Sequence, residues 1–95
     1  MSGQDAYREK YEAKIEQWSA QIEELKAKAK EAKADRKIEY QKKVDELKNK
    51  KEAMRTKLNE LKKSGKGASQ DIIDGLEKAG TDLKNSIQDA INKFK

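Results

Sequence analysis

Apolar residues recur every three or four positions along the first two thirds of the chain and form one stripe. Its members are Tyr11, Ile15, Trp18, Ile22, Leu25, Ala29, Ala32, Tyr40, Val44, Leu47, Met54, Leu58 and Leu61. No glycine or proline interrupts this stretch. The spacing predicts a coiled-coil helix, because an apolar stripe of this length has to pack against another helix.

The predicted coiled-coil helix spans residues 1–63, with Ser2 or Asp5 as its N-cap. Residues 64–67, Ser-Gly-Lys-Gly, predict a linker, because glycine suits the left-handed conformation that follows many helices. A second, amphipathic helix is predicted over residues 68–95, with Ser69 near its N-cap. The predicted fold class is therefore all-α, a long coiled-coil helix followed by a shorter amphipathic helix.

The predicted C-terminal helix repeats its apolar residues at intervals of eleven, which correspond to three helical turns. The resulting amphipathic face consists of Ile72, Ile73, Leu76, Leu83, Ile87, Ile91 and Phe94, with Ala79 and Ala90 between them. Such a face packs within a bundle or lies on a membrane surface. Its polar side mixes lysines with acidic residues, which disfavours anionic lipid, so we expect packing and keep membrane contact as an alternative. Gly75 and Gly80 are expected to cost this helix about 1 kcal/mol each relative to alanine.

The stripe of the first helix is symmetric about residue 36. When residues whose numbers add up to 72 or 73 are paired, apolar positions match one another, as Trp18 matches Met54. Either two chains pair antiparallel as continuous helices about 90 Å long, or one chain turns near residues 34–37 and forms an antiparallel three-helix bundle. Residues 33–37 contain no Gly, Asn, Ser or Pro, so the sequence favours the continuous helix.

Composition narrows the class of protein. The chain has 95 residues, of which 34% are hydrophobic and 43% charged, and it contains no Cys, His or Pro. So few apolar residues disfavour a large globular core, and their arrangement in stripes disfavours disorder. The chain has no cysteine for a disulfide, no apolar signal segment and no stretch long enough to span a membrane. We therefore predict a cytoplasmic protein.

Catalysis finds little support in the residue types present. Without histidine or cysteine the chain lacks the usual proton shuttle and thiol nucleophile. Carboxylate pairs such as Glu12 and Glu16 have no converging partners and are expected to be solvent-exposed surface. The Ser-Gly-Lys-Gly segment lacks the P-loop pattern. We predict no enzymatic activity, no catalytic residue, no cofactor, no metal ion and no small-molecule substrate.

The net charge of +5 is unevenly distributed along the chain. Basic residues are densest from Lys26 to Lys37, where only Glu31 and Asp35 are acidic. Such a segment could bind phosphate backbones without reading their sequence. The interspersed acidic residues favour a solvated helix surface instead, so nucleic-acid binding is the weaker interpretation.

Three segments carry a resemblance to a known family. They are Glu-Ala-Lys-Ala-Asp-Arg-Lys-Ile-Glu-Tyr at 31–40, Leu-Lys-Asn-Lys-Lys-Glu-Ala at 47–53, and the C-terminal Asn-Lys-Phe-Lys. Together with the order of long helix, Ser/Gly break and amphipathic helix, they make the chain resemble small bacterial coiled-coil proteins of a stress-response family known from cyanobacteria. The resemblance implies a cytoplasmic, non-enzymatic protein linked with stress, and it supplies no catalytic residues.

The sequence thus predicts a non-enzymatic, self-associating coiled-coil protein with a scaffold or stress-protective role. The predicted interface is the stripe from Tyr11 to Leu61, paired between copies in an antiparallel homodimer or a higher oligomer. Peripheral membrane binding through the C-terminal helix is the first alternative. Weak, non-specific nucleic-acid binding by the basic helix is the second.

Overall fold

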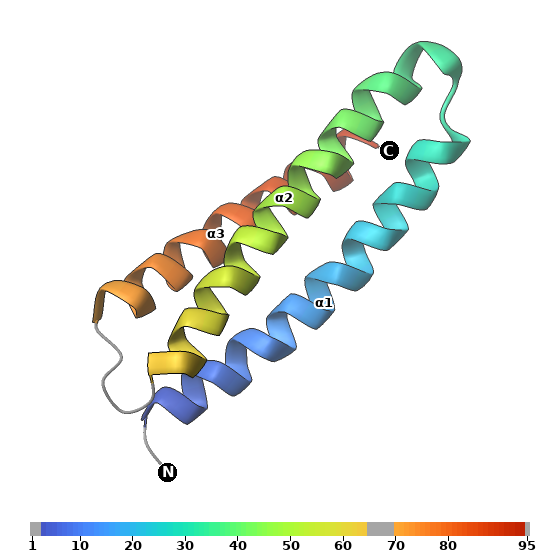
Figure 1. Cartoon of the computed structure of the whole chain (residues 1–95). Helices are drawn as coiled ribbons and strands as arrows, with labels where there is room; N and C mark the ends of the chain where they lie inside the picture. Colours follow the sequence, from blue (N-terminus) through green and yellow to red (C-terminus); the bar gives the residue numbers. More distant parts are fainter. Residues whose placement is uncertain (1–2, 65–69, 95) are drawn as a thin grey trace.

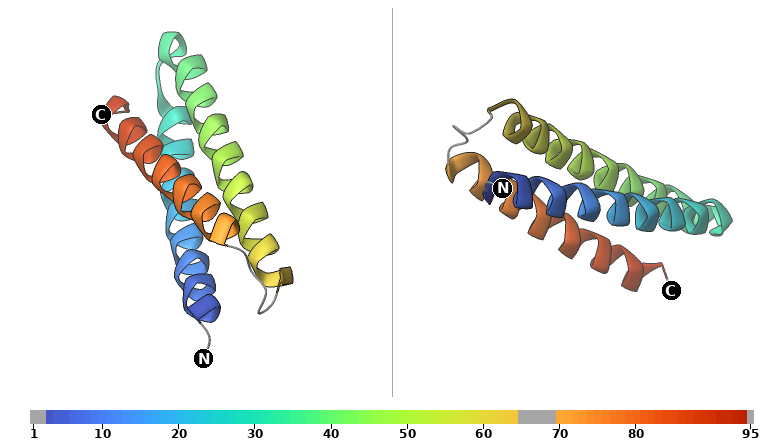
Figure 2. Two further views of the ribbon diagram at one scale, coloured as in Figure 1. Left: turned by 90° about the vertical axis from the view of Figure 1, so that its left-hand side faces the viewer. Right: turned by 90° about the horizontal axis from the view of Figure 1, so that it is seen from below.

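The computed structural model describes residues 3–64 and 70–94 and consists, in these ranges, of three α-helices. They are α1 (Gly3–Glu31), α2 (Ala34–Ser64) and α3 (Gln70–Lys93). The helices run up, down and up, and α3 lies across the pair formed by α1 and α2 (Figures 1 and 2). The bundle measures 50 × 19 × 18 Å. The all-α prediction is confirmed.

The favoured prediction of one continuous helix over residues 1–63 is wrong for this chain, which adopts the three-helix alternative. The break falls at Ala32 and Lys33, just before the predicted turn at 34–37. A two-residue connection closes the hairpin at little loop entropy, and pairing within one chain avoids the entropy lost when two chains associate. The lack of Gly, Asn, Ser and Pro therefore does not prevent a turn at Ala32 and Lys33.

The structure ends α2 at Ser64 and places α3 at Gln70–Lys93. Ser64, predicted to open the linker, is the last residue of α2. The rest of the predicted linker and the predicted N-caps Ser2 and Ser69 lie outside the described residues. Asp5, the other predicted N-cap, lies inside α1.

The apolar stripe of the first two helices forms the core of the bundle. Its large side chains are all buried, from 0% exposed at Leu47 and Met54 to 8% at Tyr40. Each aliphatic side chain that is fully buried contributes about 1.5–3 kcal/mol relative to an exposed one. From α3 the same core receives Ile73, Leu76, Leu83, Ile87 and Ala90, and Phe94 joins it just beyond that helix.

The beginning of α2 projects past its neighbours. Figures 1 and 2 show the first turn of α2 beyond the end of α1, with the two-residue connection running beside it. The Tyr40 ring stacks on Phe94, which follows α3, at 4.1 Å between ring centroids. The Tyr40 hydroxyl also donates a hydrogen bond of 3.0 Å to the Lys93 carbonyl. The chain around Ile38 therefore lacks a covering helix, and Ile38 is 66% exposed.

Polar contacts fix α3 along α2. The Lys50 ammonium donates to the Ser86 hydroxyl at 2.7 Å and lies 3.2 Å from a carboxylate oxygen of Asp82. Two helical turns beyond Asp82 in α3, Asp89 pairs with Lys43 at 3.3 Å. The hydrogen bond from Lys43 is the main cause that lowers the pKa of the Asp89 carboxyl. These contacts set the position of α3 along the bundle, while the apolar face supplies most of its stabilisation.

The two glycines of α3 have different surroundings. A methyl group at Gly80 would meet Met54 Cε and Tyr11 Cε1, both at 3.3 Å, and Trp18 Cη2 at 3.6 Å. A methyl group at Gly75 would meet only the end of the Lys57 side chain, at 3.7 Å. Gly80 therefore permits the close approach of α3 to both other helices, whereas Gly75 reduces helix stability without such a role.

We predict that two matched glycine-to-alanine substitutions in α3 change the free energy of unfolding differently. Gly75→Ala should raise the free energy of unfolding by about 1 kcal/mol, the difference in helix propensity between the residues. Gly80→Ala should give a clearly smaller gain or a loss, because its methyl group would displace Met54 and Tyr11. Urea denaturation measures both, and equal stabilisation would contradict the close packing at Gly80.

Candidate functional site

The residues predicted as an interface between copies are brought together inside one chain. The predicted interface consists of the stripe without its two alanines: Tyr11, Ile15, Trp18, Ile22, Leu25, Tyr40, Val44, Leu47, Met54, Leu58 and Leu61. The most buried of these are Ile22, Leu47 and Met54, at 0–1% exposure, and none of the others exceeds 8%. The partner helix that the stripe requires is thus the other half of the same chain. In this closed form the stripe is not a surface on which a second molecule can dock.

The predicted amphipathic face of α3 is also covered. Ile73, Leu76, Leu83 and Ile87 are buried, as is Phe94 beyond the helix. Ile72 and Ile91 are partly buried at the edges of the core. In this structure the face packs on α1 and α2, and contact with a membrane through it would require α3 to leave the bundle.

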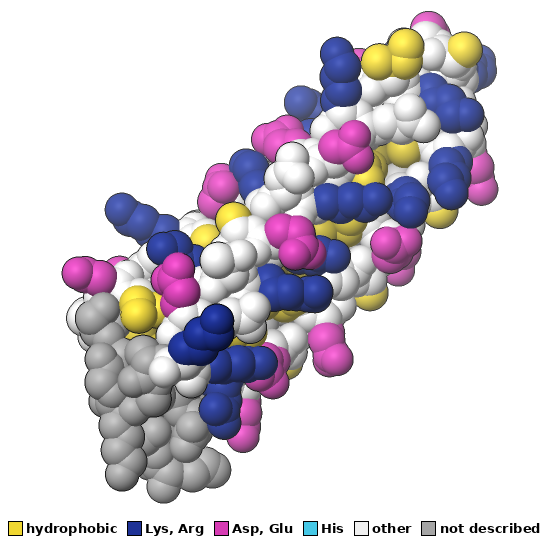
Figure 3. All heavy atoms as spheres, in the orientation of Figure 1, with side chains coloured by type: hydrophobic (Ala, Val, Ile, Leu, Met, Phe, Trp, Pro, Cys, Tyr) yellow, Lys and Arg dark blue, Asp and Glu magenta, His cyan; other side chains and the backbone are white. Residues whose placement is uncertain are grey.

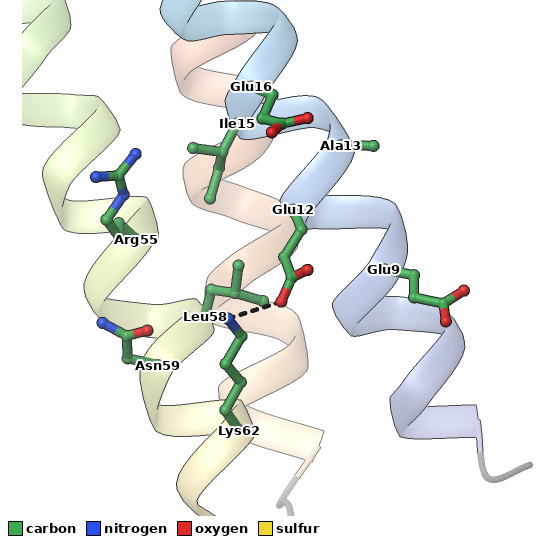
Figure 4. Close-up of a pocket in the computed structure, with 9 residues that line it drawn as sticks. All are labelled: Glu9, Glu12, Ala13, Ile15, Glu16, Arg55, Leu58, Asn59 and Lys62. Carbon is green, nitrogen blue, oxygen red and sulfur yellow. Dashed lines mark ion pairs between the residues drawn. The ribbon is translucent and has the colours of Figure 1, made fainter.

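A groove lies between α1 and α2 at the end of the bundle away from their turn (Figure 4). It has a volume of about 470 Å³. Its lining residues are Glu9, Glu12, Ala13, Ile15, Glu16, Arg55, Leu58, Asn59 and Lys62. Ile15 and Leu58 belong to the core, so the groove is the seam between two helices with a charged rim.

One ion pair crosses this groove. Lys62 Nζ lies 2.7 Å from Glu12 Oε1 (Figure 4). The hydrogen bond from Lys62 is the main cause that lowers the pKa of the Glu12 carboxyl, and the charges of Lys62 and Arg8 lower it further. A carboxylate held ionised in this way is a poor proton acceptor. The pair fixes the register of α1 against α2 and offers no acid–base chemistry.

Among the described residues, no three side chains of the metal-binding types gather to hold an ion. In the same ranges, no helix is both long enough and apolar enough to cross a membrane.

The end of the bundle at the α1–α2 turn is basic and carries few ion pairs. Within the ranges that the structure describes, the ammonium groups of Lys26, Lys28, Lys30, Lys33 and Lys37 have no carboxylate at ion-pair distance. Elsewhere in the described ranges, Lys43, Lys50, Arg55, Lys57, Lys62 and Lys93 have acidic partners, whereas Lys42, Lys48, Lys51, Lys63, Lys78 and Lys84 have none at ion-pair distance. The turn end therefore differs in the density of its unpaired bases. Figure 3 shows basic side chains beside exposed hydrophobic atoms at this end.

Sequence reasoning missed Ile38, although a signal was present. It is the large aliphatic residue of the first two helices that lies off the stripe, and it is the large hydrophobic side chain that the described structure leaves exposed. Sequence alone could not show that α2 starts beyond the other helices, so the exposure of Ile38 could not be predicted.

A scan against protein-family models finds no matching family, and searches of curated proteins and of solved structures find no match either.

We predict that the Glu12–Lys62 pair makes the stability of the fold depend on pH through the lowered pKa of Glu12. A lowered pKa in the folded state contributes stability that is present above the unfolded pKa and is lost as pH falls through the folded pKa. In Lys62→Met the pKa of Glu12 should rise towards its ordinary value, as measured by NMR titration of the Glu12 side chain. The control Lys63→Met removes the same charge one residue away and should leave the pKa of Glu12 unchanged. If the pKa of Glu12 rises equally in the Lys63→Met variant, the pairing with Lys62 is refuted.

Proposed function

We propose that the protein is a non-enzymatic scaffold that self-associates by opening its α1–α2 hairpin. In the open form the chain through Ala32 and Lys33 becomes helical, so that α1 and α2 join into one helix. Two open chains then pair antiparallel, each supplying the partner stripe that the other has lost. The observation that carries this proposal is the chemistry of the turn itself.

The turn is poorly suited to hold two helices apart. Lys33 occupies the N-cap of α2, because its carbonyl accepts hydrogen bonds of 2.9 Å from the N–H groups of Arg36 and Lys37. A lysine side chain has no acceptor for the free N–H groups of the first helical turn. Its positive charge also lies at the positive end of the α2 dipole. Apart from Asp35, residues 33–37 are good helix formers, so joining the two helices would remove these costs.

The same contacts serve both forms. Trp18 and Met54 lie on either side of Gly80 within one chain, and the symmetric stripe would bring them together between two antiparallel chains as well. The bundle is 50 Å long, whereas a continuous helix from Gly3 to Ser64 would be about 90 Å long. Pairing within one chain is favoured at low concentration, because association costs entropy. The open form is therefore expected at high protein concentration.

Such an exchange suits a scaffold whose length and valency change with conditions. A stress-protective role in the cytoplasm is what the resemblance to small bacterial coiled-coil proteins implies, and a concentration-dependent switch is consistent with that role. The absence of histidine and cysteine from the chain supports a function in binding over one in catalysis.

We predict that Lys33→Asn shifts the equilibrium towards the monomer. Asparagine at the N-cap should stabilise the closed turn by about 1 kcal/mol per chain. For a dimer of two chains this corresponds to about 30-fold weaker association. Light scattering over a concentration series measures the association constant, and X-ray scattering measures the maximum dimension. High salt should be used, because the basic segments of two open chains would repel one another.

The matched control is Lys42→Asn, which removes the same charge at an exposed position inside α2. It should leave association within a few-fold of the original protein, because residue 42 is helical in both forms. A protein that stays a compact monomer up to millimolar concentration would refute the proposal. Equal weakening by the two substitutions would show that charge, and not the cap, controls association.

A further inference from the structure

We propose that the turn end of the closed bundle docks on the surface of an anionic lipid bilayer. We call this end the basic tip and define it by Lys28, Lys30, Lys33, Arg36, Lys37 and Ile38. It combines three features that the structure brings together. These are projection beyond the other helices, four lysines with no carboxylate at ion-pair distance in the described ranges, and one exposed apolar side chain.

Projection makes the basic tip accessible. Because Phe94 stacks on Tyr40, α3 ends beside Tyr40, and the earlier residues of α2 extend beyond it (Figures 1 and 2). Ile38 thus stands at the end of a rod about 19 Å wide, where a flat surface can reach it.

The basic tip carries more than half of the net charge of the chain. Residues 28–38 contain five basic and two acidic side chains, a net charge of +3, whereas the complete chain has +5. Lys28, Lys30 and Lys33 are exposed, and in the described part of the chain they have no carboxylate partner. Unpaired lysines near a membrane surface contribute additively to its attraction for anionic lipids.

Ile38 selects the lipid surface over a nucleic acid. A phosphate backbone offers no place for a branched aliphatic side chain, whereas the boundary between headgroups and acyl chains accepts one. Base stacking on aromatic residues is the usual apolar contact with single strands, and the aromatic ring nearest the tip, Tyr40, is only 8% exposed and stacked on Phe94. Cations around a single exposed isoleucine therefore fit a bilayer better.

This mode differs from binding through α3, because it leaves the bundle closed. The protein carries its own reporter, since Trp18 is its single tryptophan and lies against Gly80 of α3. Docking by the tip should leave the fluorescence of Trp18 unchanged. Release of α3 onto the membrane would expose Trp18 and alter its emission.

The test is flotation of the full chain, at low protein concentration and low salt, with two kinds of vesicle. One contains phosphatidylcholine alone and the other includes phosphatidylglycerol. We expect binding to the anionic vesicles only. The double substitution K33Q/K37Q should weaken it about tenfold or more, and Ile38→Gln should weaken it by about threefold. The control K63Q/K78Q removes two exposed cations elsewhere and should change binding less than twofold.

Four outcomes would overturn the proposal. These are no binding to the anionic vesicles, equal losses in the tip and control variants, a change in Trp18 emission on binding, and no effect of Ile38→Gln. A duplex DNA probe is tested under the same conditions. If the duplex binds and the vesicles do not, the basic tip binds polyanions of another class and the lipid assignment is wrong. The outcome is independent of self-association, because circular dichroism and light scattering check that each variant remains a folded monomer.

Discussion

The antiparallel packing of α1 on α2 is the contact on which the rest of the molecule depends. The part of the apolar stripe on α1 and the part on α2 can be buried only against each other, and the packed pair of helices creates the surface on which α3 lies. Met54 of α2, with Tyr11 and Trp18 of α1, surrounds Gly80 of α3, so the third helix rests on side chains that the first two hold in register. The Glu12–Lys62 pair at the open end and the turn at Ala32–Lys33 mark the limits of this seam.

A seam of this kind does not specify which chain supplies the second helix. The apolar pattern is nearly symmetric, so one chain folded back on itself and two extended chains would bury the same residues. The choice depends on the short segment between the helices and on protein concentration. A turn with Lys33 at the N-cap makes the closed form less stable than a hairpin with a capping side chain would be. A single substitution at this N-cap is therefore expected to shift the balance between the closed and the open form strongly.

Much of the architecture could be predicted from the sequence, because it follows from local periodicity. The helical content, the buried stripe and the inward face of α3 all depend on spacing alone. The sequence placed a possible turn near residues 34–37 but could not decide whether the chain breaks there, since that choice reflects a balance between chain entropy and helix propensity and has no Gly or Asn to mark it. From the sequence Gly80 carries only a cost in helix propensity, because its neighbours Met54 and Tyr11 come from other helices. The exposure of Ile38 cannot be predicted from the sequence, because it results from the projecting start of α2.

The most direct measurement is the distance between two spin labels across the seam. Ala13 and Asn59 are exposed, line the same groove and can both be changed to cysteine in a chain that has none. Doubly labelled protein is diluted with unlabelled protein and measured by pulsed electron paramagnetic resonance. At low concentration we predict one short distance between the two labels, about 20 Å or two helix diameters. At high concentration a second distance of about 70 Å should appear, the separation of these residues along one continuous helix. A long distance alone in dilute solution would contradict the closed bundle, and a short distance alone at every concentration would contradict its opening.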